Sequence, residues 1–422
     1  MPNLRRLLLW SLVLLAAPVL GWLAFGERPP ERVVLVILDT VRSDHLSACG
    51  YGKATSPTLA GLEGALSCDA YAPGSWTLPS HASFFTGLWP DQHGAHAITS
   101  GVDDLSGTGN RARPLNEEHP TLAEQMTQRG YVTALFSANP VVGDTMGLGR
   151  GFDHIRSARG FGHFHGEDFD AALEDFLEEL PTGPLFLVIN IADAHMPWAS
   201  DWHPPFSELS GEPTYSKSDA NSDWSRFVVG EHPDPEGLKA RASETYDEAV
   251  WRADQNLGRA LERLGCPSVD CRLVITSDHG EMLGEHGQLD HGHYLWEENQ
   301  RVPLWTNAVD ALPDPVSALE VYWLVLEGRL IGEPVQAMSW PHVRRCARTG
   351  GRAFCNTSAA WWGPDGKQLW IDGALYAGDE LQPLTRPTIA ILDLGDRVGA
   401  DRGDGEVPPE VMELLKAAGY VD

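Results

Sequence analysis

The stretch that decides the fold reads Val33-Val34-Leu35-Val36-Ile37-Leu38-Asp39-Thr40. Its first six residues form an unbroken apolar and largely β-branched run, which is typical of a strand buried on both faces of a parallel sheet. Asp39 closes the run. Because α/β folds bind ligands at the carboxyl ends of parallel strands, we expect this carboxylate to lie in a functional site.

Two later stretches repeat this pattern of an apolar run followed by polar residues. Leu185–Ile191 (LFLVINI) is followed by Asp193 and His195, and Leu273–Ser277 (LVITS) is followed by Asp278–Glu281 (DHGE). A further strand is expected over 131–137, and helices are expected over 121–126, 168–180 and 244–264, the last as core packing. Buried strands separated by helical segments predict an α/β fold.

A different motif lies in Ser75–Gly87 (SWTLPSHASFFTG), which we interpret as a nucleophile presented at the start of a helix. Pro79 suits the first helical position, because its missing N–H would have no acceptor there. Thr77 would then lie just outside the helix, beside N–H groups that bind oxyanions such as phosphate or sulfate. A threonine near a helix cap is the commoner meaning of this pattern, so the interpretation depends on the other motifs.

The first residues, 1–27, predict a signal peptide or an N-terminal membrane anchor. Arg5 and Arg6 precede an apolar run from Leu7 to Phe25 that is just long enough to span a bilayer. We expect the segment to be retained as an anchor. In either case the rest of the chain should be exported to the periplasmic or extracellular side.

The cysteines and the net charge bear on the disulfides and on the partners to be expected. Of the six cysteines, Cys266–Cys271 and Cys346–Cys355 are close enough to form disulfides across short loops, with six buried thiols as the alternative. The formal net charge of -28 argues against a nucleic-acid partner. An anionic substrate would therefore have to be attracted locally, by a metal ion or a helix terminus.

Together these motifs resemble the sulfatase family of the alkaline phosphatase superfamily, most clearly over residues 36–52, 75–94 and 278–304. The family's active-site segment runs Cys or Ser, any residue, Pro, Ser, Arg, and later Thr-Gly. In this chain Thr77 stands at the Cys position and His81 at the Arg position.

The resemblance implies a three-layer α/β/α architecture with a mostly parallel, mixed central sheet. The catalytic domain would cover residues 31–335. A small C-terminal subdomain, with an antiparallel sheet and a closing helix over 411–420, would cover residues 336–422.

The same resemblance implies one divalent metal ion, namely Ca²⁺, Mg²⁺, Mn²⁺ or Zn²⁺. Its ligands would be Asp39, Thr77, Asp278 and His279. Many relatives carry a second acid where this chain has Thr40, so one family ligand is missing. The ion would lower the pKa of the Thr77 hydroxyl and neutralise the oxygens of the attacked ester.

Four more side chains are expected to act on the substrate. His195 and His291 would hold the oxyanion or protonate the leaving oxygen, and Arg42 and His81 would bind the substrate. Asp193, His195 and His291 offer a second metal site as an alternative, but their spacing favours a single ion.

These residues predict an exported, metal-dependent hydrolase of phosphate, phosphodiester or phosphonate esters, with Thr77 as nucleophile. Sulfatases use a formylglycine made from Cys or Ser, and its second hydroxyl expels sulfate. A threonine has one hydroxyl and a methyl group on Cβ, so it does not fit that route. A sulfuric ester hydrolase, a phosphoethanolamine-type envelope transferase and a non-enzymatic binding protein are the alternatives. The substrate, a small-molecule, lipid or glycan ester, would be selected by loops over 99–118 and 199–238.

Overall fold

The computed structural model of the chain describes residues 29–98, 112–159, 167–198, 203–207, 223, 225–268, 270–292, 295–340, 356–385 and 387–400. The predicted export segment, the Cys346–Cys355 pair, the closing helix over 411–420 and much of the two predicted loops lie outside these residues. Within the described ranges, no helix is both long and apolar enough to cross a bilayer.

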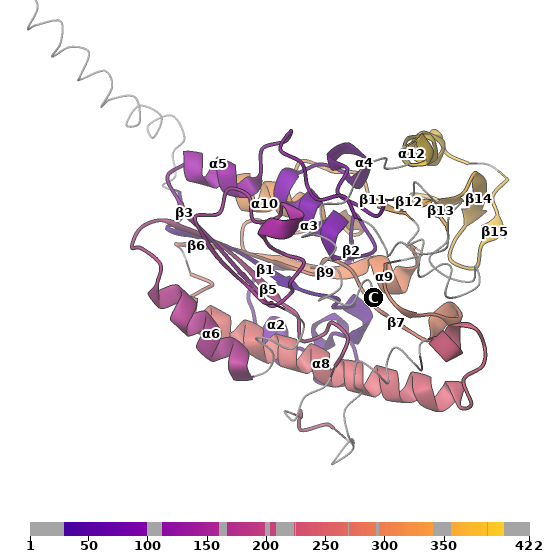
Figure 1. Cartoon of the computed structure of the whole chain (residues 1–422), viewed down its shortest axis with the longest axis horizontal. Helices are drawn as coiled ribbons and strands as arrows, with labels where there is room; N and C mark the ends of the chain where they lie inside the picture. The colour runs from indigo at the N-terminus through magenta and orange to yellow at the C-terminus, as the bar shows by residue number, and fades with distance from the viewer. Residues whose placement is uncertain are drawn as a thin grey trace, which may run out of the picture.

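A mixed sheet forms the middle layer of the described chain (Figure 1). It has eight strands in the order β10-β2-β9-β6-β1-β5-β3-β4. β9 is antiparallel to both neighbours, and the other pairings in this sheet are parallel. The strands are β1 (Arg32–Leu38), β2 (Ala65–Tyr71), β3 (Val132–Ser137), β4 (His154–Ser157), β5 (Leu185–Ile191), β6 (Cys271–Thr276), β9 (Arg301–Thr306) and β10 (Val316–Ser317). The prediction of a mostly parallel, mixed sheet is confirmed.

The three apolar runs of the sequence lie next to one another at the centre of this sheet. β1 pairs with β5 on one side and with β6 on the other. Every residue from Val33 to Leu38 is buried. Because all three strands run in the same direction, the polar residues that follow them meet at one edge of the sheet.

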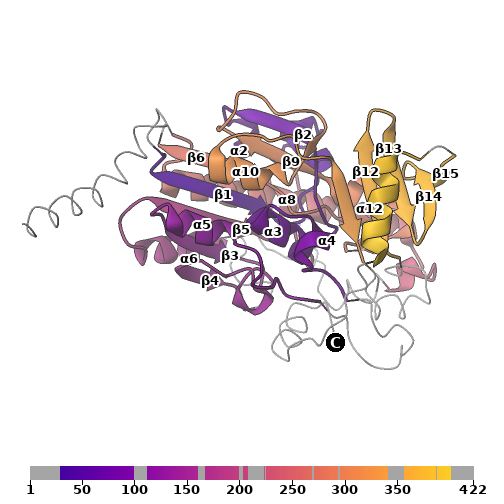
Figure 2. The same ribbon diagram turned by 90° about the horizontal axis from the view of Figure 1, so that it is seen from above.

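Helices cover both faces of the sheet, which gives the expected three layers (Figures 1 and 2). One face carries α3 (Thr77–Thr86), α5 (Leu122–Gln128) and α10 (Glu320–Glu327), and the other carries α2 (Pro57–Ala60), α6 (Glu167–Glu178) and α8 (Pro235–Leu264). Short helices α4 (Pro90–His93) and α9 (Glu297–Gln300), and the hairpin of β7 (Met282–Leu283) and β8 (Leu289–Asp290), lie in the connections.

Two of these helices show how local sequence sets a helix start. Thr121 accepts a hydrogen bond from the backbone N–H of Glu124, so α5 begins with the predicted cap. α8 begins at Pro235 and not at the predicted Glu244. The reason is local, because Pro235 follows an N-cap, Asp234, whose side chain accepts from the N–H of Gly237.

A second, antiparallel sheet follows the main one and has the order β11-β12-β13-β14-β15. Its strands are β11 (Gln336–Ser339), β12 (Ser358–Gly363), β13 (Gly366–Ile371), β14 (Ala374–Ala377) and β15 (Gln382–Pro383). α12 (Ile389–Ala400), which the sequence did not indicate, lies across it (Figure 2). This sheet confirms the predicted small C-terminal antiparallel element.

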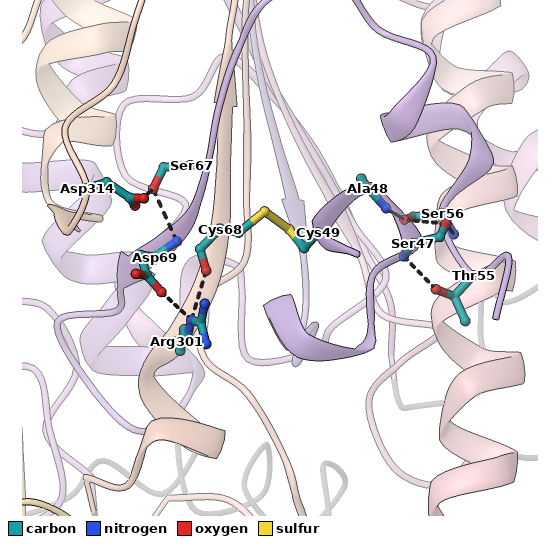
Figure 3. The surroundings of a disulfide bond; sticks show 10 residues. All are labelled: Ser47, Ala48, Cys49, Thr55, Ser56, Ser67, Cys68, Asp69, Arg301 and Asp314. Atoms are coloured by element: carbon teal, nitrogen blue, oxygen red, sulfur yellow. Dashed lines mark hydrogen bonds and ion pairs between the residues drawn. A yellow bond between two sulfur atoms is a disulfide. The ribbon is translucent and has the colours of Figure 1, made fainter. Parts of the chain in front are cut away.

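Two disulfides lie in the described chain. Cys266–Cys271 confirms the prediction from short spacing. Cys49–Cys68 joins the 3₁₀ turn η2 (Ser47–Cys49) to β2, and Arg301 of β9 donates to the carbonyl oxygen of Cys68 beside it (Figure 3). This second pair joins segments that meet only in the folded chain, so sequence spacing could not indicate it.

Candidate active site

The helix that carries the proposed nucleophile begins earlier than predicted. α3 starts at Thr77, with Trp76 as its N-cap, and Pro79 is its third residue. A proline is tolerated throughout a first turn, because none of the first N–H groups has an acceptor within the helix. Thr77 therefore lies within the first turn and not just outside the helix, as the sequence had suggested.

α3 is buried all around. All ten of its residues are buried, and the helix ends at Gly87, whose φ of 69° is left-handed. A helix enclosed in this way holds its first turn rigidly against the sheet edge. Thr77 itself has an exposed fraction of 0%.

Two nitrogen atoms lie close to the Thr77 hydroxyl. Nδ2 of Asn139 donates to Thr77 Oγ1 at 3.2 Å, and Nε2 of His279 lies 3.5 Å from the same oxygen. Asn139 follows β3 and also donates to Oδ2 of Asp39 at 2.8 Å. It was not among the predicted site residues, since one asparagine after a strand gives no sequence signal.

The predicted protein ligands Asp39, Asp278 and His279 converge in front of this hydroxyl. One ligand atom from each lies within 4.8 Å of the others. Oδ1 of Asp39 and Oδ2 of Asp278 are buried and have no hydrogen-bond partner among the described residues. Burial raises the pKa of both carboxyl groups to about 7, and their mutual repulsion adds to the shift at Asp39. Two such oxygens beside an imidazole fit a divalent cation.

The outer hydrogen bonds fix which atoms face this point. Asp39 accepts at Oδ2 from Asn139 and from Asn190 of β5, the latter at 3.0 Å. Asp278 accepts at Oδ1 from the backbone N–H groups of Thr40 and His279. Each carboxylate is therefore held by one oxygen while its other oxygen is left for the shared point, as in many metal sites.

His279 is oriented in the same way. Its Nδ1 donates to the carbonyl oxygen of Gly280 at 2.8 Å, which leaves the lone pair of Nε2 facing Asp278 Oδ2 at 3.4 Å. Burial lowers the pKa of His279 to about 4, so the ring is neutral and suited to bind a metal ion. The geometry brings all four predicted metal ligands, including Thr77, to one place.

His81, one turn along α3, also faces this point, but as a neutral ring. Its Nδ1 donates to the carbonyl oxygen of Thr77 at 3.0 Å and lies 3.4 Å from Asp278 Oδ2. Its Nε2 accepts from Nδ2 of Asn190 at 3.3 Å. Burial lowers the pKa of His81 to about 3. His81 therefore does not bring the fixed charge of the arginine that it replaces.

Two more imidazoles extend the site from the metal ligands outward. The ring of His291 lies 4.4 Å from that of His279 and 4.9 Å from that of His195, measured between centroids. Nδ1 of His291 lies 3.2 Å from Oε1 of Glu281, and Nδ1 of His195 donates to the carbonyl oxygen of Met196. Burial lowers the pKa of His195 well below its usual range. The structure thus brings both predicted histidines to the site.

Arg42 has neighbours that already use its guanidinium group. It makes hydrogen bonds with Asp44, with the carboxylate of Glu285 and with the carbonyl oxygen of Glu281. These bonds join the segment after β1 to the turn after β6. A role for Arg42 in binding substrate remains a prediction.

The residues proposed for a second metal ion are divided between two groups. Asp193 accepts from Nδ2 of Asn256 on α8 at 2.9 Å. His291 instead has ligand atoms within 4.8 Å of those of Glu281 and Asp290. The predicted trio therefore does not form one group of ligands in the described chain, and Glu281, Asp290 and His291 form a second candidate group beside the one around Asp39.

Comparison with known protein families finds relatives of this chain. The family model named Sulfatase matches residues 31–307. Phosphatidylethanolamine transferase Mcr-2 of Escherichia coli is 23% identical over 302 residues, which is 67% of this chain and 50% of that protein. Mcr-1 of Escherichia coli is 22% identical over 294 residues, or 66% of this chain and 49% of that protein. The chain thus spans about half the length of these curated relatives.

Solved structures share the fold at low sequence identity. A protein in complex with its substrate D-glucosamine-2-N,6-O-disulfate aligns with a TM-score of 0.61 and 15% identity, covering 90% of this chain and 100% of that chain. Phosphonate monoester hydrolase of Agrobacterium radiobacter aligns with a TM-score of 0.54 and 17% identity, covering 83% and 89%. These likenesses concern the fold alone. The Sulfatase family model matches more than half of the length of this chain, and the chain therefore belongs to the sulfatase family.

Proposed function

We propose that the chain is a metal-dependent hydrolase of phosphate, phosphodiester or phosphonate esters, with Thr77 as the nucleophile. The observation that carries the proposal is the position of the Thr77 hydroxyl. It lies 3.5 Å from His279 Nε2 and beside two buried carboxylates that each have one oxygen without a hydrogen-bond partner in the described chain. A threonine packed only as a helix cap would not need such neighbours.

The metal ligands in this proposal are Asp39, Asp278, His279 and the oxygen of Thr77. A bound Ca²⁺, Mg²⁺, Mn²⁺ or Zn²⁺ would supply the positive charge that lowers the pKa of the hydroxyl and stabilises the ester oxygens. Asn139 holds the hydroxyl by donating to Oγ1, which also favours the alkoxide over the alcohol. His81 and Arg42 remain the proposed contacts to substrate.

The reaction has two displacements at phosphorus. In the first, Thr77 Oγ1 forms a bond to phosphorus as the bond to the leaving oxygen breaks, and the hydroxyl proton passes to that oxygen. In the second, water attacks phosphorus in the threonine adduct, the bond from phosphorus to Thr77 Oγ1 breaks, and a proton from the water returns to Thr77; the product is phosphate, a phosphate monoester or a phosphonate, according to the substrate. His195 and His291 are the proposed proton carriers, because the ring of His291 lies beside that of His279, the ring of His195 lies beside that of His291, and burial keeps His195 neutral.

Phosphoryl transfer is favoured over sulfuryl transfer by the chemistry of threonine. A formylglycine can expel sulfate because its second hydroxyl restores the aldehyde. Thr77 has one hydroxyl, so its sulfate ester would have no equivalent exit. A phosphorylated Thr77 can be opened by attack at phosphorus.

A transferase is the second candidate, since two relatives are named phosphatidylethanolamine transferases. In a transferase the same phosphorylated threonine would be opened by an alcohol of a lipid or glycan and not by water. We also propose export, supported by the sequence of residues 1–27 and by the two disulfides, because disulfides persist in oxidising compartments.

A panel of substrates tests this proposal. Purified protein is assayed with an aryl phosphate, a phosphodiester, a phosphonate monoester and an aryl sulfate, each with Ca²⁺, Mg²⁺, Mn²⁺ or Zn²⁺, with and without a glycerol acceptor. Turnover of at least one phosphoryl ester, absent from Thr77→Ala, is the expected result. Transfer to glycerol in preference to water would favour the transferase, and turnover of the sulfate alone would contradict the proposal.

A further inference from the structure

Thr40 has an unusual backbone at the centre of the candidate metal site. Its φ of 61° is left-handed, a conformation that a β-branched residue rarely adopts. In this conformation its N–H donates to Oδ1 of Asp278 at 3.1 Å, and its hydroxyl donates to the carbonyl oxygen of Asp39 at 2.7 Å. The left-handed turn therefore bonds the carboxylate of Asp278, which follows β6, to the backbone next to Asp39, which follows β1.

A single tyrosine hydroxyl from the opposite layer braces this turn. Tyr246 of α8 donates from its hydroxyl to the carbonyl oxygen of Thr40 at 2.6 Å and accepts from the N–H of Arg42 at 2.9 Å. Its side chain is fully buried, and its ring packs edge-on against those of His45 and Trp198. The hydroxyl thus bonds both residues that flank Val41, on a helix that contributes no ligand to the metal site.

Ser277, the residue after β6, also holds this turn. Its hydroxyl accepts from the N–H of Val41 at 2.9 Å and donates to the carbonyl oxygen of His279 at 2.8 Å. The backbone after Asp39 is therefore bonded at three successive residues, by Tyr246, Ser277 and Tyr246 again. Among the described residues, the bond from Tyr246 is the only hydrogen bond between the helices of the α8 layer and Thr40.

We propose that the Tyr246 hydroxyl is a positioning group for the metal site. By holding Thr40 left-handed, it keeps Asp39 and Asp278 together against their mutual repulsion before an ion binds. Protein side chains that are already in place bind a metal ion more tightly, because less conformational entropy is lost when the ion binds. This inference rests on the metal site of the proposed function.

The test measures affinity for Mn²⁺ in the full chain, by competition with a chelating indicator, well below the unfolding temperature. The variants are Tyr246→Phe, Thr40→Gly and the two combined. Tyr131→Phe is the matched control, because Tyr131 also donates from its hydroxyl to a backbone carbonyl, that of Pro30, at the opposite edge of the sheet.

Tyr246→Phe should weaken Mn²⁺ binding by about 10- to 100-fold, the range seen when groups that orient metal ligands are removed, and Tyr131→Phe should not. Glycine adopts a positive φ without help, so in the Thr40→Gly background the same change should cost about threefold or less. A smaller effect of Tyr246→Phe in the Thr40→Gly background would show that Tyr246 acts by positioning Thr40, because a general loss of stability would weaken Mn²⁺ binding equally in both backgrounds. If Tyr246→Phe does not fold alone, the double variant should fold and bind about as well as Thr40→Gly.

Two results would overturn the inference. One is wild-type Mn²⁺ affinity in folded Tyr246→Phe, or an equal loss in Tyr131→Phe. The other is an undiminished effect of Tyr246→Phe when Thr40 is glycine. A wild-type protein that binds none of Mn²⁺, Ca²⁺, Mg²⁺ and Zn²⁺ would contradict the proposed function as well, so the two failures are distinguishable.

Discussion

Asn139 donates one hydrogen bond to the hydroxyl of Thr77 at 3.2 Å and another to the carboxylate of Asp39 at 2.8 Å, both from Nδ2. A single amide thus fixes the relative position of the proposed nucleophile and a proposed metal ligand. Because the amide nitrogen cannot accept, it also determines that Thr77 Oγ1 is the acceptor, with its own proton directed elsewhere.

Replacing Asn139 should therefore impair catalysis more than it impairs metal binding. We expect Asn139→Ala to lower kcat by about 10- to 100-fold, in the range for groups that orient metal-site residues. Asn190→Ala is the comparison variant, because Asn190 donates to the same Asp39 oxygen and to Nε2 of His81, but not to Thr77. Steady-state kinetics and metal content are measured for both variants. Equal kcat in the two variants would show that the bond to Thr77 is unimportant.

Removing the metal should reveal the repulsion between Asp39 and Asp278. Elemental analysis of protein purified without chelators should find a divalent ion, and Asp278→Asn should abolish it. The ion should raise the unfolding temperature of the wild type, since a ligand bound only by the folded state stabilises it. Once the ion has been chelated, the unfolding temperature of the wild type should be no higher than that of Asp278→Asn, because the variant lacks one of the two buried charges. An undiminished metal content in Asp278→Asn would remove this residue from the site.

A buried carboxylate on α8, Asp247, predicts a pH dependence of stability. Asp247 is bonded by His45 at 2.7 Å, by Lys53 at 2.8 Å and by Tyr51 at 2.9 Å. Burial alone would raise the pKa of Asp247, but the bonds from these three side chains prevail and hold the pKa below its ordinary value of 3.8. Asp247 therefore contributes stability that is present above pH 3.8 and is lost as the pH falls through the lowered value.

At pH 7, Asp247→Asn should lower the free energy of unfolding by about 1–3 kcal/mol, as expected for a hydrogen-bonded charge. The difference between variant and wild type should shrink as the pH falls from about 4 towards the lowered pKa, because Asp247 is protonated first in the unfolded chain and only at lower pH in the folded protein. Urea unfolding at a series of pH values measures it. A difference that stays constant down to the acid limit of folding would mean that the charge of Asp247 contributes nothing.

The two disulfides should differ in their effect on stability. Cys49 and Cys68 are separated by 19 residues, and Cys266 and Cys271 by 5. If each bond acts by restricting the unfolded chain, replacing the first pair by serine should cost about 3 kcal/mol and the second about 2 kcal/mol. Denaturant unfolding of the two double variants gives the comparison. A larger loss from the short loop would indicate that native packing, and not loop length, decides.

The sequence predicts the central strands, and the meeting of Asp39, Asp278 and His279 at one edge of the sheet, because each has a local signal. The runs ending at Leu38, Ile191 and Thr276 are apolar on both faces, and the polar residues after parallel strands must share one edge of the sheet. The start of α3 was placed two residues late, since a proline does not mark one position within a first turn.

Other site residues could not be found in this way, because their partners are distant in sequence. Asn139 and Asn190 gain their roles from Asp39, on a different strand. Tyr246 fits the apolar pattern of its helix, so it was interpreted as core packing, and only the fold reveals its bond to Thr40. The Cys49–Cys68 disulfide could not be predicted either, because its two cysteines come together only in the folded chain.

The central claim is that Thr77 forms a covalent bond to phosphorus. Protein mixed with a phosphoryl ester that turns over and quenched within one turnover is digested and analysed by mass spectrometry. The account predicts an acid-stable phosphoryl or phosphonyl adduct on Thr77, and a folded Thr77→Ala variant with no turnover. Efficient turnover of sulfate esters without any phosphoester activity, or an adduct on another residue, would contradict it.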